Sequence, residues 1–300
     1  MASLNVRAAL LSVSFLILAL GLWEMATQPP EAQTGLTEYE MLMGGADQES
    51  RVPPPSAVIK LAWAELSDPF YDAGANDKGI GIQLAYSVYR VLTGYLAAMA
   101  IALPVGFLIG MSPLMYKALN PYIQVLRPIS PLAWIPLAIL WFGIGETGKI
   151  FIIFIATFFP ILLNTVSGVK GVDPVLIRAG QVLGCETDQA LFRKVILPAA
   201  MPTIVVGLRI SFGTGWAAII AAELVAAQVG LGYLIASSSV SMSLATMFAG
   251  VLLLAITGLI GVEAVRGIHR RVVFWHPAAR GRYLFGETAF VSSPALHPSS

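Results

Sequence analysis

Residues 91–116 read VLTGYLAAMAIALPVGFLIGMSPLMY, a run of 26 residues without a charged side chain between Arg90 and Lys117. A helix needs about 20 mostly apolar residues to cross the hydrocarbon core of a bilayer. This run is long enough, and it is continuously apolar, whereas the strands of a membrane barrel alternate. Because a segment in lipid must satisfy its own backbone hydrogen bonds, the run predicts a transmembrane α-helix over residues 86–111.

The composition of the whole chain agrees with this helix. Of its 300 residues, 57% are hydrophobic and only 12% are charged, and the mean hydropathy is +0.77. A soluble domain carries about 25% charged residues. The composition therefore excludes a disordered chain, an ordinary cytosolic enzyme and a nucleic-acid binder that relies on a basic face. A single cysteine, Cys185, argues against disulfide or thiolate metal chemistry.

Other charge-poor runs predict further spans. Residues 128–145 and 150–169 contain no charge, and residues 224–262 form a charge-free run of 39 residues that glycines divide. The expected transmembrane helices cover residues 7–25, 86–111, 122–143, 149–169, 202–222 and 245–265. The sequence therefore predicts an all-α membrane protein with six transmembrane helices.

The first of these helices has two interpretations. Arg7 followed by the charge-free residues 8–23 also fits the core of a cleaved secretory signal peptide. No clear small-x-small cleavage site follows at a suitable distance. We favour an uncleaved first transmembrane helix over residues 1–25.

Lysine and arginine are enriched in cytoplasmic loops, so their distribution predicts the orientation of the chain. With the N-terminus inside, 12 of the 18 basic residues fall on the cytoplasmic side and 4 outside, while Arg90 and Arg209 lie within helices. Both termini are thus expected to be cytoplasmic. An extracytoplasmic loop is expected over residues 26–82, a transmembrane domain over residues 83–268 and a cytoplasmic tail over residues 269–300.

A short amphipathic helix is expected inside the long outer loop. Apolar residues recur at helical spacing over Ser56–Leu66, directly after a run of three prolines. Ser56 is the expected N-cap of this helix, because a serine hydroxyl can accept a hydrogen bond from an unpaired backbone N–H of the first turn.

The prolines of the third expected span indicate irregular backbone. Pro128, Pro131 and Pro136 each remove a backbone donor. Irregular backbone at membrane depth is tolerated beside a cavity or inside protein. We expect Ser130, Trp134 and the nearby backbone to face a translocation pathway, with helix–helix packing as the alternative.

Charges and glycines within the spans are further candidates. Arg209 is expected either to snorkel to the interface or pair with an acid, or to contact an anion in the pathway. Glu223, near the outer end of the same helix, is expected to cap or gate that end. Gly106 and Gly110 form a G-x-x-x-G pair, which predicts close helix packing.

The segment of residues 170–202 is polar enough to leave the membrane, yet it keeps helical apolar spacing. Asp173, followed by proline, is a helix start signal, and Gly184 is expected to end that helix. Thr187 is expected to begin a second short helix. Two prolines are expected to end the second helix, Pro198 and Pro202. A pair of short helices with a glycine corner forms a compact knob suited to a groove on a cytoplasmic partner.

This segment resembles the EAA loop of ABC importer permeases, whose pattern is Glu-Ala-Ala, three residues, Gly and then Ile-x-Leu-Pro. The resemblance is carried by IRAGQVLG at Ile177–Gly184 and FRKVILPAAMP at Phe192–Pro202. The chain departs from the pattern at Arg178, where the family usually has Glu, and at Gly180, where it has Ala. The gap before Leu-Pro is also about one residue longer.

Other motifs extend the resemblance over about residues 52–275 and towards the nitrate/sulfonate/taurine/bicarbonate branch of that family. They are LRPISPLAWIP at 126–136, WFGIGE at 141–146, FPILLNT at 159–165, GLR at 207–209, AAEL at 221–224 and GLG at 230–232. The resemblance implies a type-1 ABC importer permease fold. It also implies an ATPase-coupling loop that includes Arg178, Ala179, Gly180, Gly184, Leu197 and Pro198.

The resemblance further implies a homodimeric permease in the bacterial cytoplasmic (inner) membrane, which imports a small oxyanion such as nitrate, a sulfonate, taurine or bicarbonate. Its partners would be an ABC ATPase subunit and an extracytoplasmic solute-binding protein, with no nucleic acid involved. The sequence has no Walker-type glycine-rich loop, so we expect no ATPase site, enzymatic activity, metal or cofactor in this chain. ATP would be used by the partner.

Two other classes of function are less consistent with the sequence. A secondary transporter that needs no ATPase would be expected to carry carboxylates near the midplane and repeated halves. The sequence shows no repeat, and the candidate carboxylates, Glu223 and Glu263, fall near the ends of expected helices. A membrane-embedded enzyme would need a catalytic cluster, and the sequence offers none.

Overall fold

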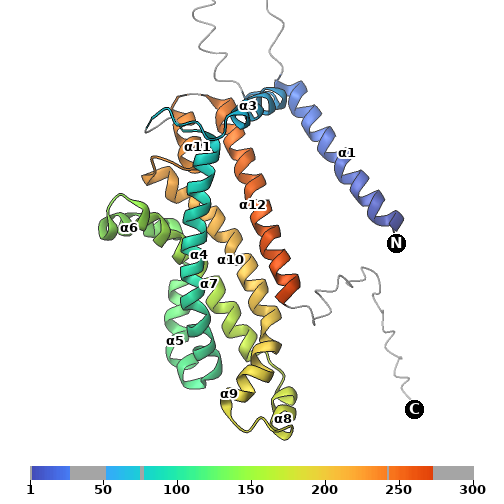
Figure 1. The fold of residues 1–300 in the computed structure, drawn as a ribbon, viewed down its shortest axis with the longest axis vertical. Coiled ribbons are helices and arrows are strands. Elements are labelled where there is room, and N and C mark those ends of the chain that lie inside the picture. Colours follow the sequence, from blue (N-terminus) through green and yellow to red (C-terminus); the bar gives the residue numbers. More distant parts are fainter. Residues whose placement is uncertain (1, 28–51, 75–77, 242, 273–300) are drawn as a thin grey trace, which may run out of the picture.

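The computed structural model describes residues 2–27, 52–74, 78–241 and 243–272. Apart from one isolated bridge between Asp72 and Lys78, the regular elements in these ranges are helices (Figure 1). The predicted all-α class is confirmed. The middle of the expected outer loop, residues 28–51, and the expected tail from residue 273 onward lie outside the described residues.

The helices long and apolar enough to cross a membrane agree with the predicted spans. In the described part of the chain there are five, or six if a bent pair is counted as one span. Each overlaps a charge-poor run of the sequence, but its ends do not coincide with the ends of that run. The five are α1 (Ala2–Thr27), α4 (Ile80–Met111), α7 (Glu146–Lys170), α10 (Leu197–Ala226) and α12 (Leu244–Val272).

The prediction of one continuous helix over residues 122–143 is wrong. The segment is divided into α5 (Pro113–Leu126), the 3-10 turn η1 (Pro131–Trp134) and α6 (Ile135–Phe142), and the chain bends there by 87°. A residue that precedes proline is driven out of the helical region of backbone conformation. Ser130, which precedes Pro131, accordingly has a ψ of 137°. The bend follows from this proline-rich stretch.

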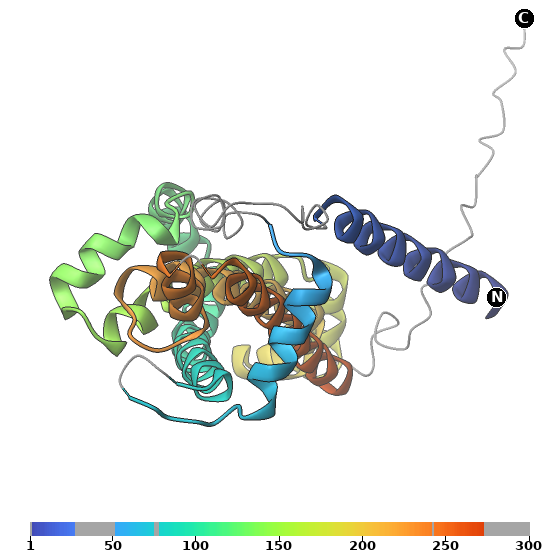
Figure 2. The ribbon, with the colours of Figure 1, turned by 90° about the horizontal axis from the view of Figure 1, so that it is seen from above.

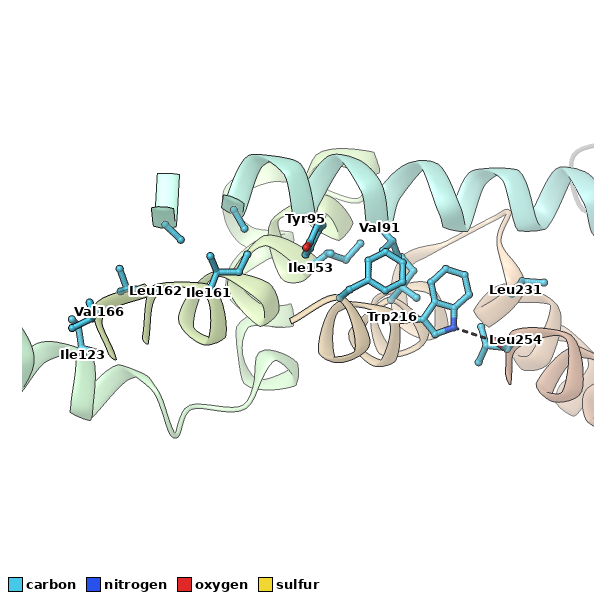
Figure 3. Close-up of a cluster of buried hydrophobic side chains, with 14 of the residues drawn as sticks. Val91, Tyr95, Ile123, Ile153, Ile161, Leu162, Val166, Trp216, Leu231 and Leu254 are labelled. Atoms are coloured by element: carbon cyan, nitrogen blue, oxygen red, sulfur yellow. Dashed lines mark hydrogen bonds between the residues drawn. The ribbon is translucent and has the colours of Figure 1, made fainter. Parts of the chain in front are cut away.

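The centre of the molecule is a bundle in which α7 packs between α4 and α10, and α12 packs on α10 (Figure 1). Figure 3 shows its main apolar cluster, in which Tyr95 and Trp216 are buried. Phe212 belongs to the same cluster. Trp216 Nε1 donates a hydrogen bond to Leu254 O at 3.1 Å, which satisfies its polar atom inside the apolar core. The core therefore joins the first and last long helices of the bundle.

The glycine pair of α4 makes the close packing that the G-x-x-x-G spacing predicts. A Cβ built on Gly106 would lie 2.7 Å from Thr165 Cβ, and one built on Gly110 would lie 2.8 Å from Val169 Cβ. Both neighbours belong to α7. The small residues let the two helix backbones approach closely, as is common between transmembrane helices.

We expect Gly106→Val to lower the free energy of unfolding by about 1–3 kcal/mol, because the added atoms overpack the α4–α7 contact. The matched control is Gly213→Val in α10, since a Cβ at Gly213 meets no atom within 4 Å. The measurement is the thermal unfolding midpoint of the detergent-solubilised protein. Equal midpoints for the two variants would show that the contact does not limit stability.

The first helix stands apart from the bundle (Figures 1 and 2). It meets the rest of the described chain at α3 (Pro55–Ser67) and through a contact between the rings of Trp23 and Phe248. Glu24 accepts hydrogen bonds from Ser56 N at 3.1 Å and from Ser56 Oγ at 2.7 Å. A carboxylate at this place satisfies an open donor of the first turn of α3.

The predicted amphipathic helix is therefore present as α3, but the N-cap role of Ser56 is wrong. The N-cap is Pro54, and Ser56 lies inside the first turn and donates to Glu24. The difference arises because a proline is favoured at the first helical position, so the helix begins at Pro55, two residues earlier than an N-cap at Ser56 would place it.

Candidate functional site

A knob of short helices follows α7 at one end of the bundle (Figure 1). We define the knob as residues 173–196, which comprise α8 (Pro174–Val182), α9 (Asp188–Leu191) and the π-helix η2 (Phe192–Ile196). The Asp173 side chain accepts a hydrogen bond from Val175 N at 2.8 Å. The Thr187 hydroxyl accepts one from Ala190 N at 3.2 Å. Both predicted helix starts are confirmed.

The corner of the knob is built on Gly184. Its φ is +90°, a conformation that glycine adopts far more readily than other residues. Gly184 N donates to Gln181 O, and Cys185 N donates to Gly180 O at 3.0 Å. These two bonds are the pattern by which a glycine-ended helix satisfies its last carbonyls. The prediction that Gly184 ends the first helix is confirmed.

The inner side of the knob has its own apolar core. A Cβ at Gly180 would lie 2.7 Å from Val195 Cγ2 and 3.3 Å from Leu191 Cδ1. Cys185 is buried in the same cluster, together with Val169, Val172, Leu191, Ile196, Ala200 and Ile204. This core holds α8 against η2 and the start of α10, so the knob is joined to two long helices.

The outer side of the knob exposes large apolar side chains. Val182 is 88% exposed and Leu183 is 83% exposed, and Val175 and Leu176 on the same short helix are also exposed. Apolar groups gathered at the tip of an otherwise polar segment are typical of a surface that a partner covers.

The structure places three of the six predicted coupling residues on the exposed side of the knob, one in its core and two at its base. Arg178, Ala179 and Gly184 are exposed, and Gly180 is buried beneath them. The remaining two lie half-buried in the first turn of α10, Leu197 and Pro198.

The prediction that Pro198 and Pro202 end the second short helix is wrong. The chain stays helical from Asp188 to Leu224, with both prolines inside α10. Leu197 N donates to Phe192 O, five residues earlier, so the hydrogen-bond ladder has already shifted where Pro198 lacks its N–H. The π-helix thus lets the helix continue, and the knob is in direct helical connection with the bundle.

At the other end of α7 and α10, an ion network joins the helices, in which Arg90, Lys149 and Glu223 are buried and Glu146 is partly exposed. Arg90 donates to Glu146 through two nitrogens, Nε at 2.5 Å and Nη2 at 2.8 Å. Its Nη1 donates to Glu223 Oε1 and to Val229 O, each at 2.6 Å. Lys149 Nζ donates to Glu146 Oε1 at 3.0 Å. The side chains of Arg90 and Glu223 are 1% and 0% exposed.

Glu223 also caps α11 (Leu231–Val240), the helix that follows. Its Oε2 accepts from Gly232 N at 2.8 Å, and both of its oxygens accept from Ser87 Oγ. Ser87 Oγ in turn accepts from Leu231 N at 3.0 Å. A carboxylate at a helix N-terminus is favoured by the open N–H groups and the helix dipole. Glu223 was predicted to cap or gate the outer end of its own helix, and the structure corrects this prediction: the carboxylate caps the start of the next helix, α11.

Two glycines make room for this carboxylate. Gly230 has a φ of +136°, and a Cβ on Gly230 would meet the carboxylate atoms of Glu223. A Cβ on Gly232 would lie 2.7 Å from Glu223 Cβ.

The sequence placed Arg90 as a charge within a helix, but no role was predicted for it. The pairing of Arg90 with Glu223 could have been suspected, because a charged side chain within a membrane span is unfavourable unless it has a partner of opposite charge.

A central cavity of about 620 Å³ lies between the proline bend, α7 and α10. Its lining is mostly apolar, with a few polar side chains. It includes Ile129, Leu132, Phe159, Asn164, Thr214 and Ala218. We call it the central cavity below.

The predicted pathway residues lie at its rim or beyond it. Ser130 is exposed between two lining residues, and its Oγ accepts from Leu132 N. Trp134 is half-buried, and its ring packs on Phe151. Arg209 is half-buried, does not line this cavity, and has no hydrogen bond or ion pair within the described residues.

Comparison with known proteins identifies the class to which this arrangement belongs. The family described as binding-protein-dependent transport system inner membrane component matches residues 102–274, which include the knob and the central cavity. The taurine transport system permease protein of Escherichia coli is 39% identical over 225 residues, which cover 75% of this chain and 80% of that protein. A nitrate import permease protein of Synechocystis is 37% identical over 225 residues, 75% of this chain and 81% of that protein.

A solved structure shares the fold. It is an inward-facing conformation of the methionine ABC transporter MetNI, with 22% sequence identity and a TM-score of 0.53, over 63% of this chain and 91% of that chain. The fold, the family match and the related permeases agree, and the chain belongs to the family of binding-protein-dependent transport system inner membrane components, the permease subunits of ABC importers.

Proposed function

We propose that this permease imports a small oxyanion, such as a sulfonate, taurine, nitrate or bicarbonate, and that a partner ATPase drives the transport. The observation that carries the substrate class is the identity of 39% and 37% to permeases named for taurine and nitrate transport. The central cavity is compatible with this class, because no aspartate or glutamate is among its lining residues and an anion would meet no like charge there.

In this proposal the knob is the docking surface for the ATPase subunit. Its exposed Val182 and Leu183 would enter a groove of that subunit. The helix from Asp188 to Leu224 is continuous, so a displacement of the knob would be carried along it towards the bundle. ATP would be bound and hydrolysed by the partner, and this chain would contribute no cofactor site. Closure of the ATPases would switch the pathway between inward-facing and outward-facing states.

The proposed assembly is a homodimer of this chain in the bacterial inner membrane, with both termini cytoplasmic. The bend and the central cavity are open on one side of the bundle in the single chain, and a second copy facing them would enclose the pathway. An extracytoplasmic solute-binding protein would deliver the anion at the end opposite the knob. The bias of basic residues to the knob side supports this orientation.

The test is uptake by proteoliposomes that contain the permease with its ATPase subunit. Labelled taurine, nitrate and bicarbonate are supplied with the solute-binding protein, and ATP is enclosed on the knob side. We expect uptake of at least one of these anions that requires both ATP and the binding protein. Uptake that persists without ATP and collapses with the proton gradient would instead support the alternative, a secondary transporter.

A further inference from the structure

A second cavity adjoins the central cavity on the side nearer the knob. Its volume is about 470 Å³, and it lies between α5 and the last turns of α7. Arg127 and Leu163 line both cavities, so the two spaces meet at these side chains. The lining of the second cavity is more polar. Its polar side chains are Tyr116, Asn120, Gln124, Arg127, Ser167 and Lys170. We call it the basic cavity.

The two cations of the basic cavity come from different helices. Arg127 is the C-cap of α5, and Lys170 is the last residue of α7. No aspartate or glutamate lines the basic cavity, and within the described residues neither cation forms a salt bridge. Two cations facing one space without a carboxylate leave a positive charge that an anion would neutralise.

The geometry of the two side chains suits a small oxyanion. Lys170 Nζ lies 3.2 Å from the centre of the Tyr116 ring, a cation–π contact that fixes the ammonium at the cavity wall. The guanidinium of Arg127 offers a planar fork of N–H donors, which matches two oxygens of a sulfonate, nitrate or bicarbonate. Asn120, Gln124 and Ser167 add neutral hydrogen-bonding groups around them.

We propose that Arg127 and Lys170 bind the transported oxyanion in the basic cavity, on its way from the central cavity to release at the knob side. This inference rests on the proposed function, because it assigns a site to the anion that the permease would carry. It differs from a general positive-inside role of these residues, since Lys117 lies at the same end of the bundle and lines a smaller third cavity with Tyr116 and Lys170, but lines neither the central nor the basic cavity.

The first test is uptake of taurine and nitrate by the reconstituted complex. We expect Arg127→Gln combined with Lys170→Gln to lower the uptake rate about tenfold or more, because charge-assisted hydrogen bonds are lost. Lys117→Gln is the matched control and should transport like the unchanged protein. An equal loss in the double variant and in Lys117→Gln, or no loss in the double variant, would overturn the proposal.

The second test separates a carried solute from a bound lipid headgroup, whose phosphate has similar chemistry. The same variants are compared in vesicles of zwitterionic lipid alone and in vesicles that contain anionic lipid. We expect the double variant to lose uptake in both kinds of vesicle. A loss confined to vesicles with anionic lipid would show that the cations bind headgroups, and would overturn the assignment.

The third test reports on the cavity without requiring transport. In a Cys185→Ala background, Ser167→Cys provides a thiol in the basic cavity, and Ala118→Cys provides an exposed thiol on α5 outside it. Anionic and cationic methanethiosulfonates are compared on the full complex. We expect the thiol at position 167 to react faster with the anionic reagent than with the cationic one, and we expect added nitrate to slow the reaction with the anionic reagent. We also expect Arg127→Gln to lower the preference about tenfold.

These tests distinguish failure of the proposed transport function from failure of the anion site in the basic cavity alone. If the unchanged complex imports none of the oxyanions, the proposed function fails, whatever the thiol reactions show. If it imports them and the reagent preference at position 167 is the same with and without Arg127, the assignment of the basic cavity fails alone.

Discussion

Replacing Arg90 with methionine is expected to lower the free energy of unfolding by about 3–5 kcal/mol, because it leaves a buried charge without its partner. Glu223 is fully buried, and its carboxylate accepts one of its hydrogen bonds from the Arg90 guanidinium. Arg90 also binds Glu146 and the carbonyl of Val229, so its loss would remove the polar links from this end of α4 to α7 and to the segment before α11. A lysine offers a single nitrogen and cannot reach all three acceptors, so Arg90→Lys should be nearly as harmful.

The measurement is unfolding in mixed micelles of increasing denaturing detergent, together with the yield of monodisperse protein. Arg266→Met is the matched control, because Arg266 forms an exposed ion pair with Glu263 at 2.9 Å. An exposed pair contributes about 0–1 kcal/mol, so this variant should unfold almost like the unchanged protein. Similar stabilities for Arg90→Met and Arg266→Met would contradict the structural importance of the buried network.

A double variant tests the cause of the instability. Arg90→Met with Glu223→Gln removes the buried charge as well as its partner, and the amide can still accept from Gly232 N. We expect it to be more stable than Arg90→Met alone, since an uncompensated buried carboxylate costs more than a neutral group of the same shape. If the double variant is the less stable of the two, packing of the arginine, and not charge balance, holds this region together.

The network shows why sequence reasoning found the spans but not this site. A span is a local property: the charge-free run at 91–116 already marks most of α4, Ile80–Met111. The partners of Arg90 lie 56 and 133 residues away along the chain. No spacing rule connects positions so far apart, and the pairing depends on how three helices pack.

The knob shows the same division between local and long-range signals. Its helix starts and its glycine corner were predicted correctly, because capping involves residues within a few positions of each other. Its end was predicted wrongly, because the effect of Pro198 depends on the π-helix that precedes it. The partner of Ser56 in α3 was missed for a related reason, since Glu24 reaches Ser56 from 32 residues away.

The bend at residues 127–130 was predicted only in part, because it depends on both local sequence and packing. The prolines of that span indicated irregular backbone, but a kinked single helix and two helices at 87° have the same proline spacing. The choice between them depends on the packing of η1 against α7 and α10, where the central cavity forms. The residues that line this cavity from α7 and α10 could not be predicted for the same reason.

Replacing Leu183 with aspartate is expected to abolish co-purification of the ATPase subunit while leaving the fold of the permease intact. The side chain is 83% exposed at the tip of the knob. Exposed substitutions usually change the free energy of unfolding by no more than about 0.5 kcal/mol. In an apolar groove, however, the carboxylate would be desolvated without a partner. A loss of about 3 kcal/mol at a central contact corresponds to more than a hundredfold weaker binding.

The comparison with neighbouring variants makes this result specific to docking. Leu183→Met keeps an apolar side chain of similar size and should retain the ATPase and uptake. Gly184→Trp should lose both, because its φ of +90° disfavours any side chain. The bulky ring would also stand on the docking face, where a Cβ meets no atom of the permease itself.

Membrane insertion and the melting midpoint should remain near those of the unchanged protein for Leu183→Asp. An aspartate variant that still co-purifies with the ATPase and transports normally would show that the exposed face of α8 is not the docking surface, and the exposed part of α9 would then be the next candidate.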